Sequence, residues 1–320
     1  MVAPPADATD EAARRARRRT LWRRIRRATR GPRNAVLARV IWGTARAVGQ
    51  LPVPVALALG RSLGRGANAV MRQPRELAMA HMAMALPELD DAARRRLARD
   101  TFVHAAQAFV ELPLTRRLLQ RPDYVRFDGA EHLAAGLAGG RGVVAATGHT
   151  GHWELLAAAV AMRFPVTVVA RKVTDDRFND LIVRFRRQSG CEVLLRDDPN
   201  FLAAARDVLR RNRILALLID QDTRGAGVFV PFFGMLARTP PGPAILALRS
   251  HAPVVTAFIH RRPEGGHQIH IAPVDLTAHT GRDRITTLTA ALTTAIEAQI
   301  RRAPAEWVWW HERWRNQPGA

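Results

Sequence analysis

The sequence predicts an α/β fold with a mixed, mostly parallel sheet flanked by helices. After residue 123, short apolar runs alternate with helical segments, which is typical of strands that are covered on both faces. The segment before residue 123 has helical periodicity instead. The 320 residues, of which 48% are hydrophobic, are enough to form one large core.

The elements of the predicted sheet follow one another in regular order. Apolar runs predict strands at residues 142–147, 166–170, 192–195, 214–219 and 254–259. The segments between and after them predict helices at residues 153–162, 176–189, 200–211, 242–250 and 283–302. Ligands of such sheets bind beyond the carboxyl ends of the strands, so functional side chains are expected in the loops that follow these runs.

Residues from about 70 to 122 are predicted to be helical, with stops at Pro87 and Pro113. Methionines and aromatic residues in this region, such as Met82 and Phe102, recur at roughly helical spacing. We interpret them as core packing and not as part of a cofactor site.

Residues 1–33 form a basic tail that is expected to be disordered. Eleven arginines lie between Arg14 and Arg33, with no acidic residue among them. A solvated tail and a segment that lies on anionic lipid headgroups both explain this composition. Nucleic acid attracts the same charge, but the sequence has no helix-turn-helix, zinc-finger or RNA-recognition signature, so no nucleic-acid partner is expected.

Residues 34–66 are predicted to be a helical segment that associates with a membrane. From Val40 to Gly60 only Arg46 is charged, but the longest uncharged run is shorter than the roughly 20 apolar residues that a spanning helix needs. An interfacial, monotopic anchor is therefore favoured over a spanning helix. A secretory signal is not expected, because no apolar stretch is followed by a small-residue cleavage site.

The composition also limits the partners and the compartment. A formal net charge of +21 favours an anionic partner such as a membrane surface. Cys191 is the only cysteine, which excludes an intramolecular disulfide and a cysteine-rich metal site and fits a reducing compartment.

The junction after the first predicted strand carries the residues with the clearest chemistry. There the apolar run leads into the sequence GHTGHWE at residues 148–154. On a regular helix His149 and Glu154 would lie about 140° apart, so they can meet only if the chain turns at Gly148 and Gly151. A histidine that is oriented by a carboxylate is a general base suited to deprotonating a hydroxyl.

Two other interpretations of this junction stay open. His149 and His152 could satisfy buried polar groups beneath the sheet. A metal site made of His149, His152 and Glu154 is disfavoured, because no clear segment supplies a further ligand, so no metal is expected. The spacing alone is weak evidence, since 11 histidines and 28 acidic residues give about one such pair by chance.

Blocks along the whole chain add to this junction. The GHTGHWE segment resembles the His-x4-Asp/Glu motif of glycerolipid acyltransferases, and specifically that of the bacterial lipid A biosynthesis lauroyl/myristoyl acyltransferase family. The family's anchor region, basic-helix segment, Asp-x-Asp turn and tryptophan-rich close are similar to residues 50–64, 170–190, 217–255 and 304–315. The resemblance covers roughly residues 36–316. The sequence departs from the family pattern at Thr150 and His152. It also has Glu312 at a position where the family has a cationic residue.

The resemblance implies a role for individual residues. His149 would take the proton from the acceptor hydroxyl, and Glu154 would orient His149. Four further residues would bind the substrates, namely Arg171, Arg186, Asp220 and Asp222. Arg186 is the best match for the family's arginine in the basic helix, although Arg184 and Arg187 are adjacent. A solvated helix face for the arginines and capping of the following loop by the aspartates are the alternatives.

The resemblance also implies a reaction. Residues 67–316 would form an O-acyltransferase domain that moves a fatty acyl chain from acyl carrier protein or coenzyme A to a hydroxyl of a lipid A precursor, in lipopolysaccharide biosynthesis. The acyl thioester would be the co-substrate, with no other cofactor. The enzyme would be peripheral or monotopic on the inner membrane, with its active site on the cytoplasmic side. Alternatives are an acyltransferase for phosphatidylinositol mannosides or another glycolipid or aminolipid, and a non-catalytic basic module that binds membranes or nucleic acid.

Overall fold

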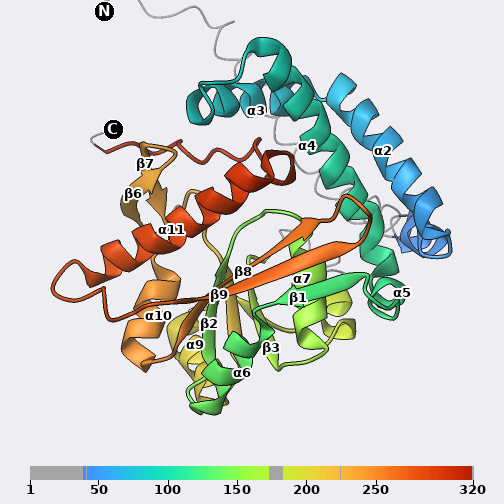
Figure 1. The fold of residues 1–320 in the computed structure, drawn as a ribbon. Coiled ribbons are helices and arrows are strands. Elements are labelled where there is room, and N and C mark those ends of the chain that lie inside the picture. The colour runs from blue at the N-terminus through green and yellow to red at the C-terminus, as the bar shows by residue number, and fades with distance from the viewer. Residues whose placement is uncertain (1–38, 41, 173–182, 224, 319–320) are drawn as a thin grey trace, which may run out of the picture.

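A seven-stranded sheet lies at the centre of the computed structural model, which describes residues 39–40, 42–172, 183–223 and 225–318 (Figure 1). The strand order is β1-β9-β8-β2-β5-β3-β4. The strands are β1 (Val125–Asp128), β2 (Val143–Thr147), β3 (Val166–Ala170), β4 (Glu192–Leu195), β5 (Ile214–Leu218), β8 (Val254–Arg261) and β9 (His267–Val274).

The sheet is mixed and mostly parallel, as the sequence predicts. Strands β8, β2, β5, β3 and β4 run in one direction, whereas β9 pairs antiparallel with β8 and parallel with β1. The five predicted strands are all present within a few residues of their expected bounds. The sequence did not predict β1 and β9, because neither has a continuous apolar run. Strand β1 alternates between half-buried and exposed positions, and β9 alternates between buried and more exposed ones.

Helices cover both faces of the sheet and divide the core in two. Helices α6 (Ala130–Ala138) and α7 (Trp153–Ala161) pack with one face, and α9 (Phe201–Arg210), α10 (Gly242–Ser250) and α11 (Arg284–Arg302) pack with the other. Along β2, Val143 and Ala145 point into the first cluster, while Val144 and Ala146 point into the second. This two-sided burial explains why the central strands are apolar throughout.

A helical assembly precedes the sheet and crosses one end of it (Figure 1). It comprises α2 (Val53–Val70), α3 (Arg72–Ala85), α4 (Asp91–Glu111), the short 3-10 helix η1 (Leu112–Leu114) and α5 (Thr115–Leu119). Helices α2 and α4 pack so closely that a Cβ atom at Gly64 would lie only 2.4 Å from the Cα atom of Val103. Asp90 caps α4, where its Oδ1 accepts a hydrogen bond of 2.6 Å from the backbone of Ala93.

The predicted membrane-associating segment is only partly described. Residues 42–48 are helical and α2 follows, whereas residues 34–38 and the basic tail at 1–33 lie outside the described residues, as does the first half of the helix predicted at 176–189. Val55, Leu63 and Val70 on α2 are exposed apolar side chains. Among the helices that the structure describes, none has both the length and the hydropathy to cross a bilayer.

The chain ends in a tryptophan-rich segment that packs on a small hairpin. Strands β6 (Val228–Phe232) and β7 (Met235–Thr239) form this hairpin, and the 3-10 helix η2 (Pro304–Glu306) follows α11. Trp307, Trp309 and Trp314 are buried and serve as packing. This segment brings residues 307–316 next to the carboxyl end of β2, where Thr150 forms a bridge with Trp307.

Candidate active site

The loop at residues 148–152 connects β2 to α7 and carries His149. Gly151 has a φ of +60°, and a Cβ atom there would lie 1.8 Å from the carbonyl oxygen of Ile259. Only glycine fits this turn, so the loop cannot continue β2 as a strand. The Gly151 backbone N–H donates a hydrogen bond of 2.9 Å to the carbonyl oxygen of Glu306, which ties the loop to the C-terminal segment.

His149 is held by the carboxylate of Asp220. The distance from His149 Nδ1 to Asp220 Oδ1 is 2.8 Å, and the backbone N–H of His149 donates to Asp220 Oδ2 over 2.7 Å. The indole N–H of Trp307 donates to the same Oδ2 over 2.8 Å. Asp220 follows β5, the parallel neighbour of β2, so the two side chains meet at the carboxyl ends of adjacent strands.

These contacts fix the charge of Asp220 and the tautomer of His149. Burial by itself raises the pKa of Asp220, but the charge of His149 and the hydrogen bonds from His149 and Trp307 outweigh it and hold this pKa well below its usual range. A carboxylate only accepts hydrogen bonds, so Nδ1 of the neutral His149 ring carries the proton and Nε2, which has the Gln221 amide nitrogen at 3.3 Å, can accept one. The His149 side chain is 21% exposed, while that of Asp220 is fully buried. His149 thus has the orientation and access of a general base.

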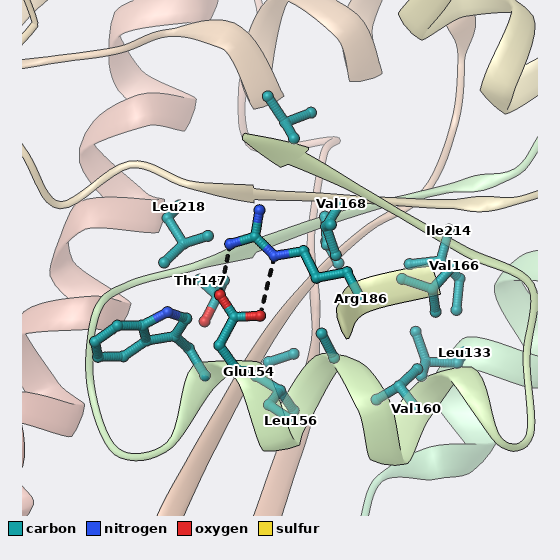
Figure 2. A pocket seen from close by; sticks show the side chains of 16 residues that line it. Leu133, Thr147, Glu154, Leu156, Val160, Val166, Val168, Arg186, Ile214 and Leu218 are labelled. Carbon is teal, nitrogen blue, oxygen red and sulfur yellow. Dashed lines mark hydrogen bonds and ion pairs between the residues drawn. The ribbon is translucent and has the colours of Figure 1, made fainter. Parts of the chain in front are cut away.

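Glu154 does not take the position that the sequence analysis assigned to it. Its carboxylate forms a two-point ion pair with Arg186, with distances of 3.0 Å to Nε and 2.5 Å to Nη2 (Figure 2). Within the described residues, no hydrogen bond joins Glu154 to His149. Glu154 lies in the first turn of α7, beyond the turn at Gly151, and its side chain reaches the helical segment at residues 183–188.

An apolar pocket of about 60 Å³ lies between α7 and the sheet, beside this ion pair (Figure 2). Its walls are mostly aliphatic and include Ala145, Leu156, Ala157, Val168, Ala216 and Leu218. Trp153 also lines the pocket, and its ring centroid lies 5.0 Å from that of His149. The Trp153 side chain therefore contacts both the pocket and the His149 ring. Small residues at strand positions, such as Ala145 and Ala216, were the sequence signal that could have predicted it.

The remaining predicted site residues differ in their surroundings. Arg171 is exposed at the end of β3, and Arg186 is half-buried whereas Arg184 and Arg187 are exposed. The Asp222 side chain is only 3% exposed and lies apart from the pocket lining, in an ion pair of 3.2 Å with Arg315 and a hydrogen bond from Asn316. The structure thus brings Asp220 to His149 and Glu154 to Arg186, while Asp222 holds the C-terminal segment.

His152 is buried and has a structural contact. Its Nδ1 accepts a hydrogen bond of 3.3 Å from the backbone N–H of Leu155, which caps α7. His149, His152 and Glu154 therefore engage three different partners. In the described ranges, no three His, Cys, Asp or Glu side chains are grouped so that they could hold a metal ion.

A second histidine, His311, faces His149 and was not singled out in the sequence. The two ring centroids lie 5.3 Å apart with an interplanar angle of 88°. Gln221 lies beside both rings, with Nε2 at 2.6 Å from His311 Nδ1. In the sequence, only its place in the tryptophan-rich segment at residues 304–315 marked His311.

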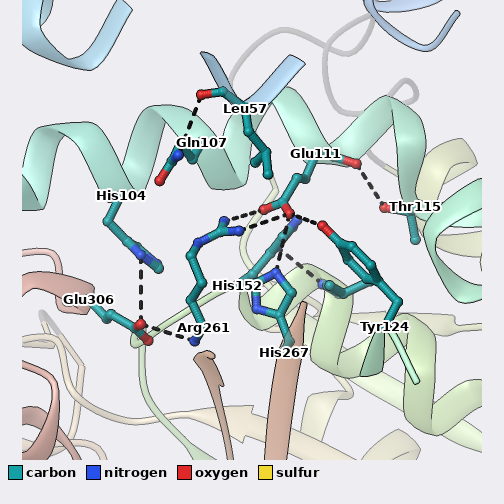
Figure 3. Close-up of polar contacts among 11 residues, drawn as sticks. Leu57, His104, Gln107, Glu111, Thr115, Tyr124, His152, Arg261, His267 and Glu306 are labelled. Atoms are coloured by element: carbon teal, nitrogen blue, oxygen red, sulfur yellow. Dashed lines mark hydrogen bonds and ion pairs between the residues drawn. The ribbon is translucent and has the colours of Figure 1, made fainter. Parts of the chain in front are cut away.

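Another polar assembly, the Glu111 cluster, lies at the end of α4 and consists of Glu111, Tyr124, Arg261 and His267 (Figure 3). The Glu111 carboxylate accepts hydrogen bonds from Arg261 at 3.2 Å and 2.5 Å and from Tyr124 at 2.7 Å. His267 Nε2 lies 3.3 Å from Glu111 Oε1. Burial by itself raises the pKa of Glu111, but His267 and Arg261 outweigh it and hold this pKa well below its usual range.

Comparisons with known proteins show the family of the chain. Residues 27–316 match the family model of the bacterial lipid A biosynthesis acyltransferases. A phosphatidylinositol mannoside acyltransferase of Mycobacterium tuberculosis is 30% identical over 62% of this chain and 62% of its own length. That of Mycolicibacterium smegmatis is 32% identical over 62% of this chain and 64% of its own. The matches thus span a little under two thirds of these relatives. A lipid A biosynthesis lauroyltransferase of Escherichia coli is 26% identical over 84% of this chain and 88% of its own length.

Proposed function

Because the chain belongs to the bacterial lipid A biosynthesis acyltransferase family, we propose that it transfers a fatty acyl group from a thioester to a hydroxyl of a glycolipid. The observation that carries this proposal is the pairing of His149 with a buried Asp220 beside an apolar pocket. A base with a free Nε2 is suited to a hydroxyl, and an apolar pocket is suited to a hydrocarbon chain.

In the proposed reaction His149 acts as the base and Asp220 as its orienting partner. The acceptor O–H gives its proton to Nε2 of His149 as its oxygen forms a bond to the thioester carbon. The buried carboxylate of Asp220 stabilises the imidazolium that results. When the tetrahedral intermediate collapses, the C–S bond breaks and the thiolate takes the proton from His149. The ester and the free thiol are the products, and His149 returns to its neutral state.

We assign the apolar pocket to the acyl chain of the donor. Trp153 lines the pocket and packs on His149, so a chain lying there presents its first carbon near the base. Each methylene group that the pocket buries is expected to stabilise the bound acyl chain by about 0.8 kcal/mol. The ion pair of Glu154 and Arg186 is part of the lining and supplies polar groups at the head of this chain.

Arg171 is proposed to bind an anionic group of the donor or acceptor. It is exposed at the carboxyl end of β3, the edge of the sheet at which His149 lies. Arg186 is neutralised by Glu154, so its contribution to substrate binding is through its hydrogen-bond donors and not through net charge.

A lipid A precursor is the proposed acceptor, and acyl carrier protein or coenzyme A the proposed donor. A phosphatidylinositol mannoside is the second candidate acceptor, since the mycobacterial relatives that carry this name share 30% and 32% identity with the chain. The lauroyltransferase of Escherichia coli favours the first candidate by its longer match.

We further propose that the protein is peripheral or monotopic on the cytoplasmic side of the inner membrane. Exposed Val55, Leu63 and Val70 on α2 can enter the headgroup region. The eleven arginines between Arg14 and Arg33 add attraction to anionic lipids.

The test is acyl transfer by the purified protein. Acyl carrier protein and coenzyme A thioesters of several chain lengths are each combined with a lipid A precursor and with a phosphatidylinositol mannoside, and the lipids are analysed by mass spectrometry. The proposal expects one acceptor to gain the mass of the acyl chain. No acylated product with any pair, together with DNA binding that weakens steeply with salt, would favour a non-catalytic basic module instead.

A further inference from the structure

A second imidazole lies at the same edge as His149 and comes from the far end of the chain. His311 belongs to the segment that follows η2, and its ring stands nearly perpendicular to that of His149 at a centroid distance of 5.3 Å. The two histidines share the Gln221 amide nitrogen, which lies 3.3 Å from both ring nitrogens of His149 and 2.6 Å from Nδ1 of His311. Of the two rings, His149 also contacts the Asp220 carboxylate, through its Nδ1.

The contact with Gln221 sets the tautomer of His311. With the amide oriented as in the structure, Nε2 of Gln221 is a hydrogen-bond donor, so Nδ1 of His311 accepts over 2.6 Å and carries no proton. The proton of the neutral ring therefore lies on Nε2. Among the described residues, no oxygen lies within hydrogen-bond distance of His311 Nε2, whose only recorded polar neighbour is the Gln221 amide nitrogen at 3.3 Å.

His311 is also neutral near pH 7, because its pKa is lowered. Burial, and after it the charge of His149, lowers the pKa of His311 to about 4. Two imidazoles at this distance do not readily carry charge together, and only His149 has a carboxylate partner. The edge therefore holds one histidine that can become a cation and one that remains a neutral donor.

The segment that carries His311 is firmly held. The buried guanidinium of Arg313 donates to the carbonyl oxygen of Arg238 over 2.7 Å and to Oγ1 of Thr239 over 2.6 Å. The backbone N–H of Arg313 donates to the carbonyl oxygen of His311 over 2.7 Å. A donor fixed before the substrate arrives stabilises developing charge without reorganising.

We propose that His311 is a catalytic residue whose Nε2–H donates a hydrogen bond to the thioester carbonyl oxygen as this oxygen becomes an oxyanion. The proposal rests on the proposed function. As the acceptor oxygen bonds to the carbonyl carbon and loses its proton to His149, the carbonyl π electrons move to the oxygen that His311 holds. When the C–S bond breaks these electrons return to the carbonyl, the thiolate takes the proton from His149, and His311 keeps its own proton throughout.

The spacing of the two histidines suits this division of roles. A base and an oxyanion donor must reach two different oxygens of the same tetrahedral carbon, each over about 3 Å. Ring centroids 5.3 Å apart allow this if the reacting carbon lies beside both rings. The placement also gives Asp222 a positioning role, because its ion pair with Arg315 holds the segment two residues past Arg313.

The test compares His311→Leu, which removes the donor, with His311→Gln, which can place an amide N–H near the position of Nε2. The full chain is used with the donor and acceptor pair that the wild-type protein accepts. His311→Leu is expected to lower kcat about 10²–10³-fold, with KM for both substrates changed less than about threefold. His311→Gln is expected to recover kcat to within about tenfold of wild type.

The matched control is His81→Leu. His81 contacts the same C-terminal segment, where its Nδ1 lies 2.8 Å from the carbonyl oxygen of Trp309, but it has no contact with His149 or Gln221. Its kcat is expected to stay within about threefold of wild type. An equal loss of kcat in His81→Leu and His311→Leu would overturn the proposal, because displacement of the segment would then explain both.

Nitrogen NMR of labelled histidine gives a readout that needs no turnover. At pH 7 His311 is expected to be neutral and protonated at Nε2. A cationic ring, or a proton on Nδ1, would overturn the proposal, as would wild-type kcat in His311→Leu. The last result leaves the proposed function intact, whereas an inactive wild-type protein counts against the proposed function itself.

Discussion

Two groups of histidines and carboxylates lie in this fold, one around His149 at the edge of the sheet and one around Glu111 at the end of α4. Both pair an imidazole with a buried carboxylate that also accepts from an aromatic residue, Trp307 in the first and Tyr124 in the second. The difference is access. The His149 side chain is 21% exposed and lies beside a pocket, whereas those of His267 and Glu111 are 0% and 1% exposed.

We infer from this difference that the group around His149 is catalytic and the group around Glu111 is architectural. In the Glu111 cluster Arg261 neutralises the carboxylate, and the group joins α4 to β8 and β9. At the edge of the sheet no arginine pairs with Asp220 in the described residues, so its charge is left to stabilise a proton on His149. The same chemical groups can thus hold a fold together or act on a substrate, according to which cation faces the carboxylate and whether solvent reaches the ring.

The largest expected effect is on the catalytic side of the comparison. Asp220→Asn presents an amide to Nδ1 of His149, so the ring proton moves to Nε2 and the base is lost. We expect kcat for acyl transfer to fall about 10²–10⁴-fold with little change in KM. Glu154→Gln is the control, because Glu154 contacts Arg186 and not His149, and its loss is expected to be less than about tenfold. A larger loss in Glu154→Gln than in Asp220→Asn would return the orienting role to Glu154.

The next effect is on stability and belongs to the Glu111 cluster. Glu111→Gln takes from the largely buried Arg261 guanidinium the carboxylate with which it forms its ion pair, so the free energy of unfolding is expected to fall by about 3–5 kcal/mol. Urea unfolding measures this loss, and kcat per folded molecule is expected to stay near that of wild type. If Glu111→Gln is as stable as wild type but inactive, the cluster takes part in the reaction and the contrast with the His149 edge is wrong.

A smaller effect tests the pocket beside His149. Ala216→Leu fills part of the cavity from β5, so the longest acyl chains should be rejected while shorter ones remain substrates. With about 0.8 kcal/mol per buried methylene, excluding two methylenes lowers kcat/KM about tenfold. Ala203→Leu, at an exposed position of α9, is the matched control and should keep the wild-type preference. If both variants keep the same preference for chain length, the acyl chain does not lie in this pocket.

The smallest effect is a pH dependence that burial imposes on the interior histidines. Burial lowers the pKa of His104 to about 4 and that of His152 to about 3, so each binds a proton more readily in the unfolded chain. The stability is therefore unaffected above about pH 6.5 and falls below it, on the order of 1 kcal/mol per pH unit for each histidine. Urea unfolding at pH 7, 6 and 5 measures this slope. His152→Asn keeps an N-cap for α7 but removes one titrating group, so an unchanged slope would contradict the assignment.

The sequence predicted the parts of this molecule whose physics is local. Continuous apolar runs identified the central strands, and the glycines at 148 and 151 marked the loop that carries His149. Strands β1 and β9 were missed because every second residue of β1 is exposed and the buried residues of β9 are separated by more exposed ones, so no continuous apolar run marks them. The partner of His149 was assigned to Glu154, five residues away, whereas Asp220 is 71 positions away. That contact depends on β2 and β5 becoming neighbours, which local spacing does not encode. The same reason applies to His311, which the C-terminal segment brings to His149.

The most direct measurement of the central claim is the rate of acyl transfer by His149→Ala with the wild-type donor and acceptor, alongside its thermal unfolding. The imidazole is partly exposed and does not belong to the buried core, so its removal is expected to leave the melting temperature within a few degrees of wild type. The rate is expected to fall at least about 10³-fold. Transfer at the wild-type rate by the folded variant would contradict the account, because no base would then be needed at position 149.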